Sequence, residues 1–495
     1  MRKDRVDVRR LAPLLILVAA AALVPAGATA SRHDDRAPTL TRSLTRLVPL
    51  PDGEANFGFT FRIFDTTDPI WGDTRPFAER IRDSIQTELA GKTPTFIKVW
   101  TPWQRPDQKG KPYVPFSDAA ADISAVRGVV GERGLLHLDW TIGLTNPVNG
   151  GLTVRDIRQG RADAYIRSFA RDVRDYGKPI LVTLFASEFN ANWIYATSPR
   201  ANSELTTADF TQAWRRVVDI FDAVGATNVS WAWIVNAYAA DPSQQPQIDR
   251  DIGAYYPGDD YVDWVGVDVY DVGLPNWMDG PYAFAVAHHK PVFVGEFGIR
   301  HEWSSLQPSQ WQPWLASAFD YFESHPAIKA ISYFNFCNRA GATHVAWDPG
   351  RSVYLPNGVN YVPNVNDHDH RLLAGGPALQ ALFASRIANP RYVSAIATET
   401  VESSPEVATA QLLDPRVRGR SAIVRWSGNL GADTYDLAIK RQSGGWRTVV
   451  SHTSSRSRRI AGSSRERVLL RVRAWDVDGV PGPWSAVRRL VFAFH

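Results

Sequence analysis

The sequence predicts an α/β fold: a (β/α)8 TIM barrel with a C-terminal all-β immunoglobulin-like sandwich. Three observations support this prediction. Apolar, strand-like runs alternate eight times with amphipathic helical stretches between residues 54 and 392. After residue 412, short strands separated by Gly-rich turns replace this pattern. The chain has 495 residues, enough for both parts, because a barrel alone takes roughly 250 residues.

The chain begins with a predicted secretory signal peptide, residues 1–30. Basic residues precede an apolar run from Leu11 to Val24, and a small-residue cleavage site ends at Ala30. The apolar run is too short to span a bilayer. We therefore expect a secreted, extracellular or cell-wall-associated protein, exported by the Sec or the twin-arginine route. Residues 31–53 are polar and lack a sustained period, so they are predicted to form a flexible segment.

Eight apolar runs are predicted to form the barrel strands. They lie near residues 57–64, 95–100, 135–142, 179–188, 228–236, 262–270, 291–297 and 328–336. Strands that are apolar almost throughout are typical of a parallel sheet covered by helices. Between them, Phe210, Trp214 and Phe221 recur on one helical face, as do Tyr165 and Phe169. An open doubly wound sheet is the alternative, but no Gly-rich phosphate loop follows the first strand.

Residues 393–412 are a predicted linker rich in Ser, Thr, Glu and Ala. Residues 413–495 are then predicted to form a small antiparallel sandwich. Its strands are expected near residues 422–426, 434–440, 446–452 and 468–475. The stretch from Arg471 to Gly479, followed by Trp484-Ser485, resembles a fibronectin type III domain.

Charge is distributed unevenly between the two predicted domains. Residues 411–495 hold 16 Lys and Arg against 6 Asp and Glu, a net charge of +10, whereas residues 31–410 carry about −9. The surplus of positive charge suggests that the C-terminal module is attracted to an anionic cell wall or an acidic glycan. Docking of this module against the acidic barrel and a plain solvated basic surface are the alternatives.

No cofactor and no metal ion are expected. Asp367-His368-Asp369-His370 places four ligand-type side chains in sequence, but they point in different directions, whereas tetrahedral sites draw their ligands from separated positions. A solvated loop is the preferred interpretation. Cys337 is the only cysteine, so no intramolecular disulfide can form and stability must come from the size of the core.

Two of the predicted barrel strands end on a glutamate. Glu188 ends the fourth strand, and Glu296 lies at the end of the seventh, 108 residues later. All strands of a (β/α)8 barrel direct their carboxyl ends to one mouth, so the two carboxylates are expected to face each other there. A retaining glycosidase needs two carboxyl groups about 5–5.5 Å apart, one as nucleophile and one as acid and then base. A salt bridge at the barrel rim is the alternative role for either residue.

The segment from Glu188 to Trp193 resembles the E-x-N-x-x-W segment of glycoside hydrolase family 26, a clan A family best known for endo-β-mannanases. The longest further match runs from Tyr256 to Tyr270. Shorter matches lie at residues 157–166, 214–215 and 228–233. The resemblance extends in order over about residues 54–390. It implies hydrolysis of O-glycosyl bonds by an enzyme similar to mannan endo-1,4-β-mannosidase.

By this resemblance Glu188 is the acid/base and Glu296 is the nucleophile, with Tyr270 donating a hydrogen bond to the nucleophile. A phenol donor favours the ionised carboxylate that a nucleophile requires. The residues expected to bind substrate are Asn190, Trp193, Asn236, Asp268, Tyr270 and Trp347. For each of these a structural role in the barrel or its rim is the alternative.

Two positions depart from the family pattern. Mannanases of this family usually have His directly before the acid/base and Arg three positions further back, whereas this chain has Ser187 and Leu184. The loss of an imidazole and a guanidinium beside the reacting sugar leaves β-glucan and β-xylan open as substrates beside mannan.

We therefore predict a secreted retaining endo-β-glycosidase that acts by double displacement on a β-linked polysaccharide, with mannan as the leading substrate. The rival interpretation is a non-catalytic glycan-binding or cell-surface protein on a hydrolase scaffold. We expect a monomer with a polysaccharide partner, no nucleic-acid partner and no stable membrane insertion.

Overall fold

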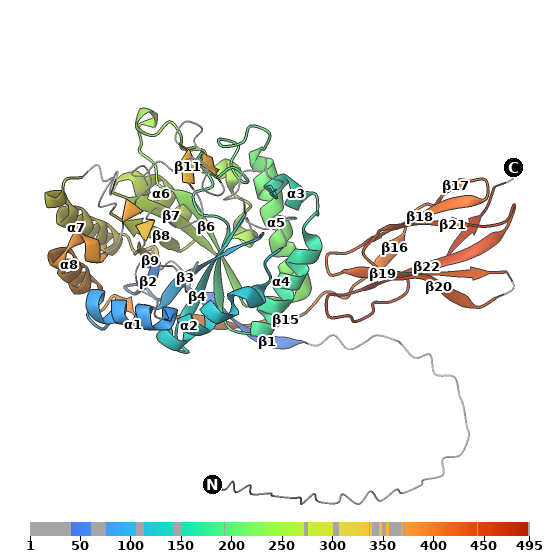
Figure 1. Cartoon of the computed structure of the whole chain (residues 1–495), viewed down its shortest axis with the longest axis horizontal. Helices are drawn as coiled ribbons and strands as arrows, with labels where there is room; N and C mark the ends of the chain where they lie inside the picture. Colours follow the sequence, from blue (N-terminus) through green and yellow to red (C-terminus); the bar gives the residue numbers. More distant parts are fainter. Residues whose placement is uncertain are drawn as a thin grey trace, which may run out of the picture. The chain divides into compact units, whose positions relative to one another are not determined.

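The computed structural model has the two-part architecture that the sequence predicts, a parallel barrel and an antiparallel sandwich (Figure 1). The structure describes residues 41–60, 76–104, 113–142, 151–192, 194–271, 276–299, 306–335, 337–338, 346–348, 353–355, 368–369, 372–442 and 444–493. The predicted signal peptide, residues 1–30, lies outside the described residues and stays a prediction.

Eight parallel strands form the wall of the barrel. They are β2 (Ala55–Thr60), β3 (Phe96–Pro102), β4 (Leu135–Thr141), β5 (Ile180–Phe185), β6 (Val229–Asn236), β7 (Trp264–Tyr270), β8 (Val292–Gly298) and β9 (Ile328–Phe334). Each pairs with the next, and β9 pairs with β2, which closes the sheet. The predicted closed barrel is confirmed, with each strand within a few residues of its expected place.

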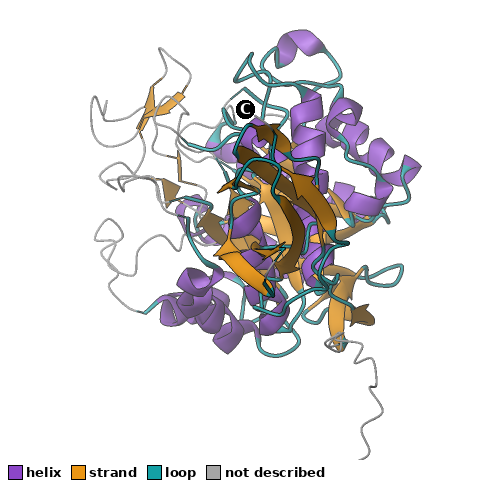
Figure 2. Cartoon of the chain, turned by 90° about the vertical axis from the view of Figure 1, so that its right-hand side faces the viewer, coloured by secondary structure: helices purple, strands orange, loops and turns teal. Residues whose placement is uncertain are grey.

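Helices surround the strands on the outside of the barrel (Figures 1 and 2). They are α1 (Phe77–Glu88), α2 (Ala120–Val130), α3 (Val154–Arg158), α4 (Asp163–Tyr176), α5 (Thr207–Val224), α6 (Asp279–Ala287), α7 (Pro308–Ser324) and α8 (Pro377–Ile387). The main core lies between the helices and the outer face of the strands. As predicted, Phe169 of α4 and Trp214 of α5 face this core. A smaller cluster fills the barrel interior, and it includes Phe96, Leu181 and Phe293.

Residues 42–48, which were predicted to be part of a flexible segment, form a strand instead. β1 (Arg42–Val48) pairs antiparallel with β15 (Ala397–Ser403), which lies in the predicted linker. Leu47 is buried against the cluster inside the barrel, and its carbonyl accepts a hydrogen bond of 3.1 Å from Ser230 Oγ on β6. The flexible segment and the linker are therefore shorter than predicted, because burial of apolar side chains on β1 compensates for ordering this ribbon.

The C-terminal module is a sandwich of two antiparallel sheets, as predicted. One sheet contains β16 (Ala410–Leu412), β17 (Arg416–Arg418), β18 (Ser421–Gly428) and β21 (Ser457–Ala461). The other contains β19 (Thr434–Arg441), β20 (Trp446–Thr453), β22 (Arg467–Trp475) and β23 (Arg488–Val491). Their inner faces share a separate core that includes Trp426, Tyr435 and Val472. The likeness to a fibronectin type III domain stays a prediction.

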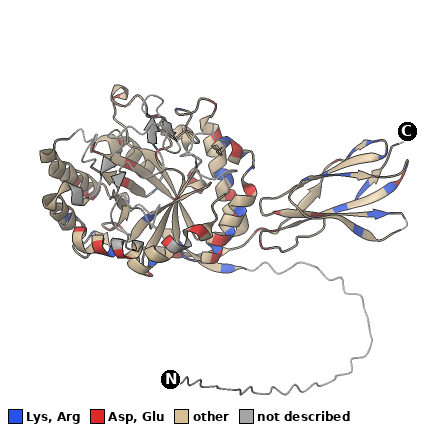
Figure 3. Ribbon diagram, viewed as in Figure 1, with Lys and Arg blue, Asp and Glu red and all other residues tan. Residues whose placement is uncertain are grey.

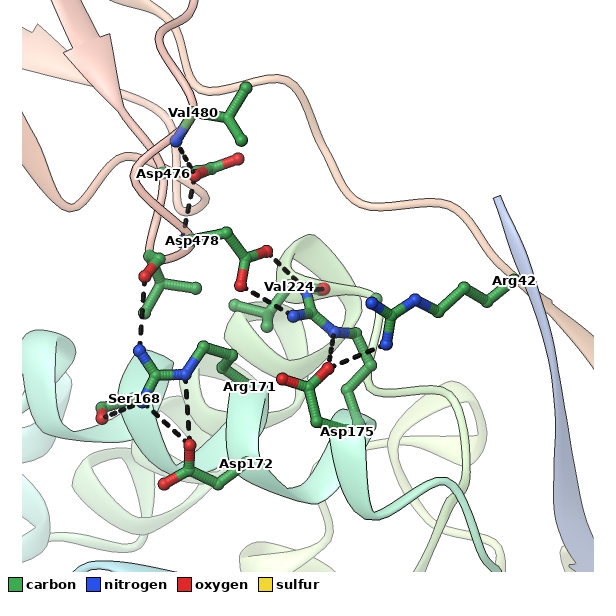
Figure 4. Close-up of polar contacts among 12 residues, drawn as sticks. Arg42, Ser168, Arg171, Asp172, Asp175, Val224, Asp476, Asp478 and Val480 are labelled. Atoms are coloured by element: carbon green, nitrogen blue, oxygen red, sulfur yellow. Dashed lines mark hydrogen bonds and ion pairs between the residues drawn. The ribbon is translucent and has the colours of Figure 1, made fainter. Parts of the chain in front are cut away.

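Arginines on α4 hold the module against the barrel (Figure 4). Arg174 donates two hydrogen bonds, of 2.9 and 2.8 Å, to the two carboxylate oxygens of Asp478. Arg167 lies 3.2 Å from Asp433, and Arg171 donates a 3.4 Å hydrogen bond to the carbonyl of Val477. The docking alternative assumed a basic module on an acidic barrel. At this contact the charges are reversed, since the barrel supplies the cations.

Short strands follow the barrel wall. β11 (Ala346–Asp348) pairs with β12 (Val353–Leu355), β10 (Cys337–Asn338) pairs with β13 (His368–Asp369), and β14 (Tyr392–Val393) joins the barrel sheet beside β2. Asp367 and His370 of the tetrad lie outside the described residues, as does the Cys337 side chain. Within the described part of the chain, no helix is long and apolar enough to cross a membrane.

Candidate active site

The predicted acid/base, Glu188, lies on a turn with unusual backbone geometry just after β5. Phe185 and Glu188 have φ angles of +75° and +61°, a region that side-chain-bearing residues seldom occupy. The backbone N–H of Glu188 donates a 3.0 Å hydrogen bond to the carbonyl of Ile234 on the neighbouring strand β6. Strained backbone of this kind persists where the surrounding fold enforces it, and it is typical of functional sites.

An amide network orients the Glu188 side chain. Asn236, at the end of β6, donates a hydrogen bond from Nδ2 to Glu188 Oε1. The N–H of Asn236 in turn donates a 2.8 Å hydrogen bond to Oδ1 of Asn190. Glu188 itself is partly exposed, so its carboxyl group is positioned by the protein and remains accessible.

Asn190 was predicted to bind substrate, and the structure buries it. Its side chain is fully buried, and its Nδ2 group donates to the carbonyls of Asp249 and Asn236 at 3.0 and 3.4 Å. Its Oδ1 accepts from the backbone of Asn236, so both ends of the amide are occupied by backbone groups. These contacts favour a role in fixing the turn that carries the acid/base.

The predicted nucleophile, Glu296, lies on β8 with both carboxylate oxygens held. Tyr270 at the end of β7 donates a hydrogen bond to Oε2, as the family resemblance implies. Lys98 on β3 donates a hydrogen bond to Oε1. Burial and then the negative charges of Glu296 and Glu188 raise the pKa of Tyr270 well above its usual value. The phenol therefore keeps its proton and acts as a donor.

Lys98 and Asp139 are site residues that the sequence analysis missed. The Lys98 ammonium is completely buried, 2.9 Å from Asp139 Oδ2 on β4 and in contact with Glu296. Burial alone would lower the pKa of Lys98, but the carboxylates of Asp139 and Glu296 more than offset this and raise it. Each is a charged residue inside an apolar run that is predicted to be a buried strand. A charge at such a position is the signal in the sequence that could have identified them.

Asp268 was predicted to bind substrate, but it lies beneath the site. Its side chain has no exposed surface, and it is beside Glu296 in the paired strands β7 and β8. Burial and then the charge of Glu296 raise the pKa of Asp268 well above its usual value, over the opposing effect of Lys98. A raised pKa makes protonation of this carboxyl group easier, which limits the repulsion around Glu296.

The two glutamates share one electrostatic environment. Both Glu188 and Glu296 act on the ionisation of Tyr270 and on that of Asp268. The barrel therefore brings a partly exposed carboxyl group from β5 and a buried, firmly held one from β8 to the same mouth. This is the arrangement that an acid/base and a nucleophile require.

The remaining predicted contacts are only partly visible. Trp193 lies outside the described residues, as does the side chain of Trp347, whose backbone is in β11. Their predicted stacking on a sugar stays a prediction. At the two positions that depart from the family pattern, Leu184 is fully buried and Ser187 lies beside Asp268.

No cofactor site is evident among the side chains that the structure describes. They contain no group of three or more His, Cys, Asp or Glu residues placed to hold a metal ion. The Lys98 ammonium occupies the space between Asp139 and Glu296 where a cation would bind. The carboxylates at the mouth are thus paired with a side chain of the protein itself.

Comparison with known proteins identifies the barrel. Residues 161–307 match the sequence model of glycosyl hydrolase family 26. This chain carries a glycosyl hydrolase family 26 domain. The matched region spans α4 to the loop before α7, and it contains both Glu188 and Glu296. The family assignment made from the sequence is confirmed.

Two known enzymes are similar to part of this chain. Endoglucanase H of Acetivibrio thermocellus is 29% identical over 238 residues, which are 46% of this chain and 23% of that protein. The beta-1,3-xylanase of an Alcaligenes species is 24% identical over 236 residues, 43% of this chain and 46% of that protein. The chain therefore spans less than half the length of these relatives.

Solved structures of mannanases are similar to this chain as well. An endo-beta-1,4-mannanase from Cellulomonas fimi aligns at 15% identity with a TM-score of 0.48, over 90% of this chain and 95% of that one. The mannanase BoMan26A from Bacteroides ovatus aligns at 15% identity with a TM-score of 0.42, over 69% and 90% of the two chains.

Proposed function

We propose that this protein is a retaining endo-β-glycosidase that hydrolyses a β-linked polysaccharide by double displacement. One observation favours it above the others: Glu296 is held by Tyr270 and Lys98 while Glu188, partly exposed, is held by Asn236 at the same mouth. Family 26 membership supports the reaction class. The names of the relatives extend the range of candidate backbones from mannan to β-glucan and β-1,3-xylan.

In the first step, Glu296 attacks the anomeric carbon while Glu188 donates its proton to the departing glycosidic oxygen. Tyr270 and Lys98 each donate a hydrogen bond to Glu296 and so fix its orientation. In the second step, Glu188 removes a proton from water, which attacks the glycosyl ester on Glu296 and releases the sugar with its anomeric configuration retained.

Mannan is the leading predicted substrate, and the presence of Ser187 and Leu184 widens the range of candidate substrates. The mannanase pattern places an imidazole and a guanidinium at these positions, whereas here a small hydroxyl and an apolar side chain stand there. Lys98 is then the positive charge nearest the nucleophile among the residues described. We therefore include unsubstituted β-glucan and β-1,3-xylan beside mannan as backbones for this site.

The experiment is a release assay on mannan, mixed-linkage β-glucan, β-1,3-xylan and β-1,4-xylan, with the anomer of the first product followed by proton NMR. We expect hydrolysis of at least one backbone, loss of that activity in Glu188→Ala and Glu296→Ala, and a β-anomer formed first. Absence of turnover on all four, or unchanged turnover in both variants, would favour the non-catalytic glycan-binding alternative. An α-anomer formed first would exclude the retaining mechanism.

A further inference from the structure

The acidic side chains of the C-terminal module are all engaged in contacts. Between residues 411 and 495 there are six Asp and Glu residues. Five of them form ion pairs: Asp414 with Arg488, Asp433 with Arg167, Asp436 with Arg473, Glu466 with Arg441, and Asp478 with Arg174. The sixth, Asp476, accepts hydrogen bonds from the backbone N–H groups of Asp478 and Val480. Two of these acids are used by arginines of the barrel, which leaves module arginines without a carboxylate.

Four of the remaining arginines lie on one face. Strands β17 and β21 flank β18, and in the paired register Arg416 and Arg459 both lie opposite Ile423. Arg418 and Arg425 follow on the same side, because alternate residues of a strand share a face. The other side of these strands, which includes Ala422, Val424 and Ile460, is buried in the core of the sandwich. We call the outer side, with Arg416, Arg418, Arg425 and Arg459, the arginine face.

The arginine face carries positive charge alone. Within the described part of the chain, none of its four guanidinium groups forms an ion pair, and three of the four side chains are exposed. The outward positions between them on β18 and β21 are serine, isoleucine and alanine, with no acidic residue. Lys and Arg residues are visible along these strands in Figure 3.

The opposite sheet uses its arginines differently. Arg471 lies 4.3 and 4.2 Å from the ring centres of Trp446 and Trp484, and Arg473 lies 4.5 Å from that of Trp475. Arg473 also forms a 2.9 Å ion pair with Asp436. These guanidinium groups are enclosed by indole rings and a carboxylate, so they hold the sheet together. Among the residues that the structure describes, the arginines of the arginine face have no ring or carboxylate partner of this kind.

We propose that the arginine face binds an acidic polysaccharide. Neighbouring strands lie about 4.8 Å apart and alternate residues of one strand about 6.8 Å apart, so the four side chains present donors at several points on a flat surface. Guanidinium groups match carboxylate and phosphate oxygens with paired hydrogen bonds. A flexible polymer with one anionic group on many of its sugars can engage several of these arginines at once.

Other polyanions fit this surface less well. The outward positions include no aromatic ring on which nucleic-acid bases could stack and no helix that could enter a groove. The exposed apolar side chains on or beside this face are Ile423 and Leu413, too few to insert into a lipid bilayer. The choice of a glycan rests in part on the proposed function, because a module that holds an acidic polysaccharide keeps the barrel beside neutral β-glycans of the same matrix.

The test uses the full chain with the Glu296→Gln substitution, so that hydrolysis does not contribute, and measures its binding to polygalacturonate by co-sedimentation. We expect this binding to weaken steeply as salt is raised from 50 to 300 mM. We also expect that changes in the module leave the binding of neutral mannan unaltered. Replacing Arg416, Arg418, Arg425 and Arg459 by Gln should weaken binding at least about tenfold. Turnover of a neutral substrate by the same variant in the wild-type background should be unchanged.

The matched control removes the same number of charges from the opposite sheet, at Lys440, Arg447, Arg467 and Arg489, all of which are exposed. We expect this control to keep binding within about threefold of the parent. Equal weakening by the two variants would mean that only net charge matters, and it would overturn the proposal. Tighter binding to duplex DNA than to polygalacturonate at 150 mM salt would also overturn it, and thermal melting of both variants confirms that they fold.

Discussion

The barrel mouth and the arginine face arrange positive charge in opposite ways. At the mouth, one buried cation, Lys98, is surrounded by the carboxyl groups of Asp139, Glu296 and Asp268. On the arginine face, four guanidinium groups stand together, and none forms an ion pair with a residue that the structure describes. A charge taken out of water must be compensated on the spot, whereas an exposed charge can stay unpaired and attract a partner from solution. Burial thus separates the cation that serves chemistry from those that serve binding.

Among the substitutions at these two regions, we expect the largest loss of activity from a change at Glu296. Replacing it with Gln removes the nucleophile and leaves Lys98 with one carboxylate fewer, so kcat should fall by roughly 10⁴-fold or more. The measurement is the initial rate on whichever backbone the wild type hydrolyses. A loss below tenfold would show that Glu296 does not react with the substrate.

Glu188→Ala should have the next largest effect, and its size should depend on the leaving group. Proton donation contributes roughly 10²- to 10⁴-fold to the rate on a polysaccharide. On an aryl glycoside with an acidic phenol as leaving group, the first step needs no proton, so that step should be much less affected. Equal losses on both substrates would mean that Glu188 acts in another role.

Lys98→Met tests the role of the buried cation at the mouth. Without it, Glu296 loses a hydrogen bond and the positive charge beside its carboxylate, so kcat should fall by about tenfold or more. The matched control is Lys329→Met, which removes another nearly buried lysine, paired at 2.8 Å with Asp52. The control should change stability without lowering kcat.

Because Lys98→Met also leaves Asp139 buried without a partner, the double variant with Asp139→Asn keeps the balance of charge. It should regain much of the lost stability and still show the reduced kcat. A kcat that returns to that of the wild type would assign Lys98 a purely structural role.

The smallest effect concerns the contact between the domains. A hydrogen bond from Arg174 holds the pKa of Asp478 below its usual value, so this pair stabilises the folded protein at neutral pH and loses its effect as the pH falls below about 4. Asp478→Asn should cost up to about 1 kcal/mol at pH 7, and the difference should shrink at pH 3. The measurement is thermal melting at both values.

The control for this effect is Asp414→Asn, which removes an exposed carboxylate of the module that pairs with Arg488 and does not contact the barrel. It should change the melting temperature less than Asp478→Asn at pH 7. A larger change in the control would show that the contact with Arg174 contributes little.

Much of the fold was predictable from the sequence, because the alternation of strands and helices is a local pattern. The strand β1 was not, because its partner β15 lies about 350 residues away and its apolar residues alternate with polar ones in a stretch rich in charge. The two glutamates and Tyr270 were predicted from their places at strand ends and from the family resemblance. Lys98 was missed because its contacts with Asp139 and Glu296 depend on three strands coming together.

Two of the predicted substrate contacts are buried, for one reason. Asn190 and Asp268 were placed near the mouth correctly, but their burial depends on the turn after β5 and on the pairing of β7 with β8. A polar residue near the end of a strand can face the substrate or support the residue that does. The sequence gives no means of distinguishing these two cases.

The most direct test of the central claim is to trap the glycosyl intermediate with 2-deoxy-2-fluoro glycosides of a mannobiosyl and a cellobiosyl unit that carry a good leaving group. If Glu296 is the nucleophile, the enzyme should lose activity with time and gain the mass of one fluorinated glycosyl group. The labelled peptide should then carry the sugar on Glu296. A label on any other residue, or hydrolysis of the natural substrate with inversion, would contradict it.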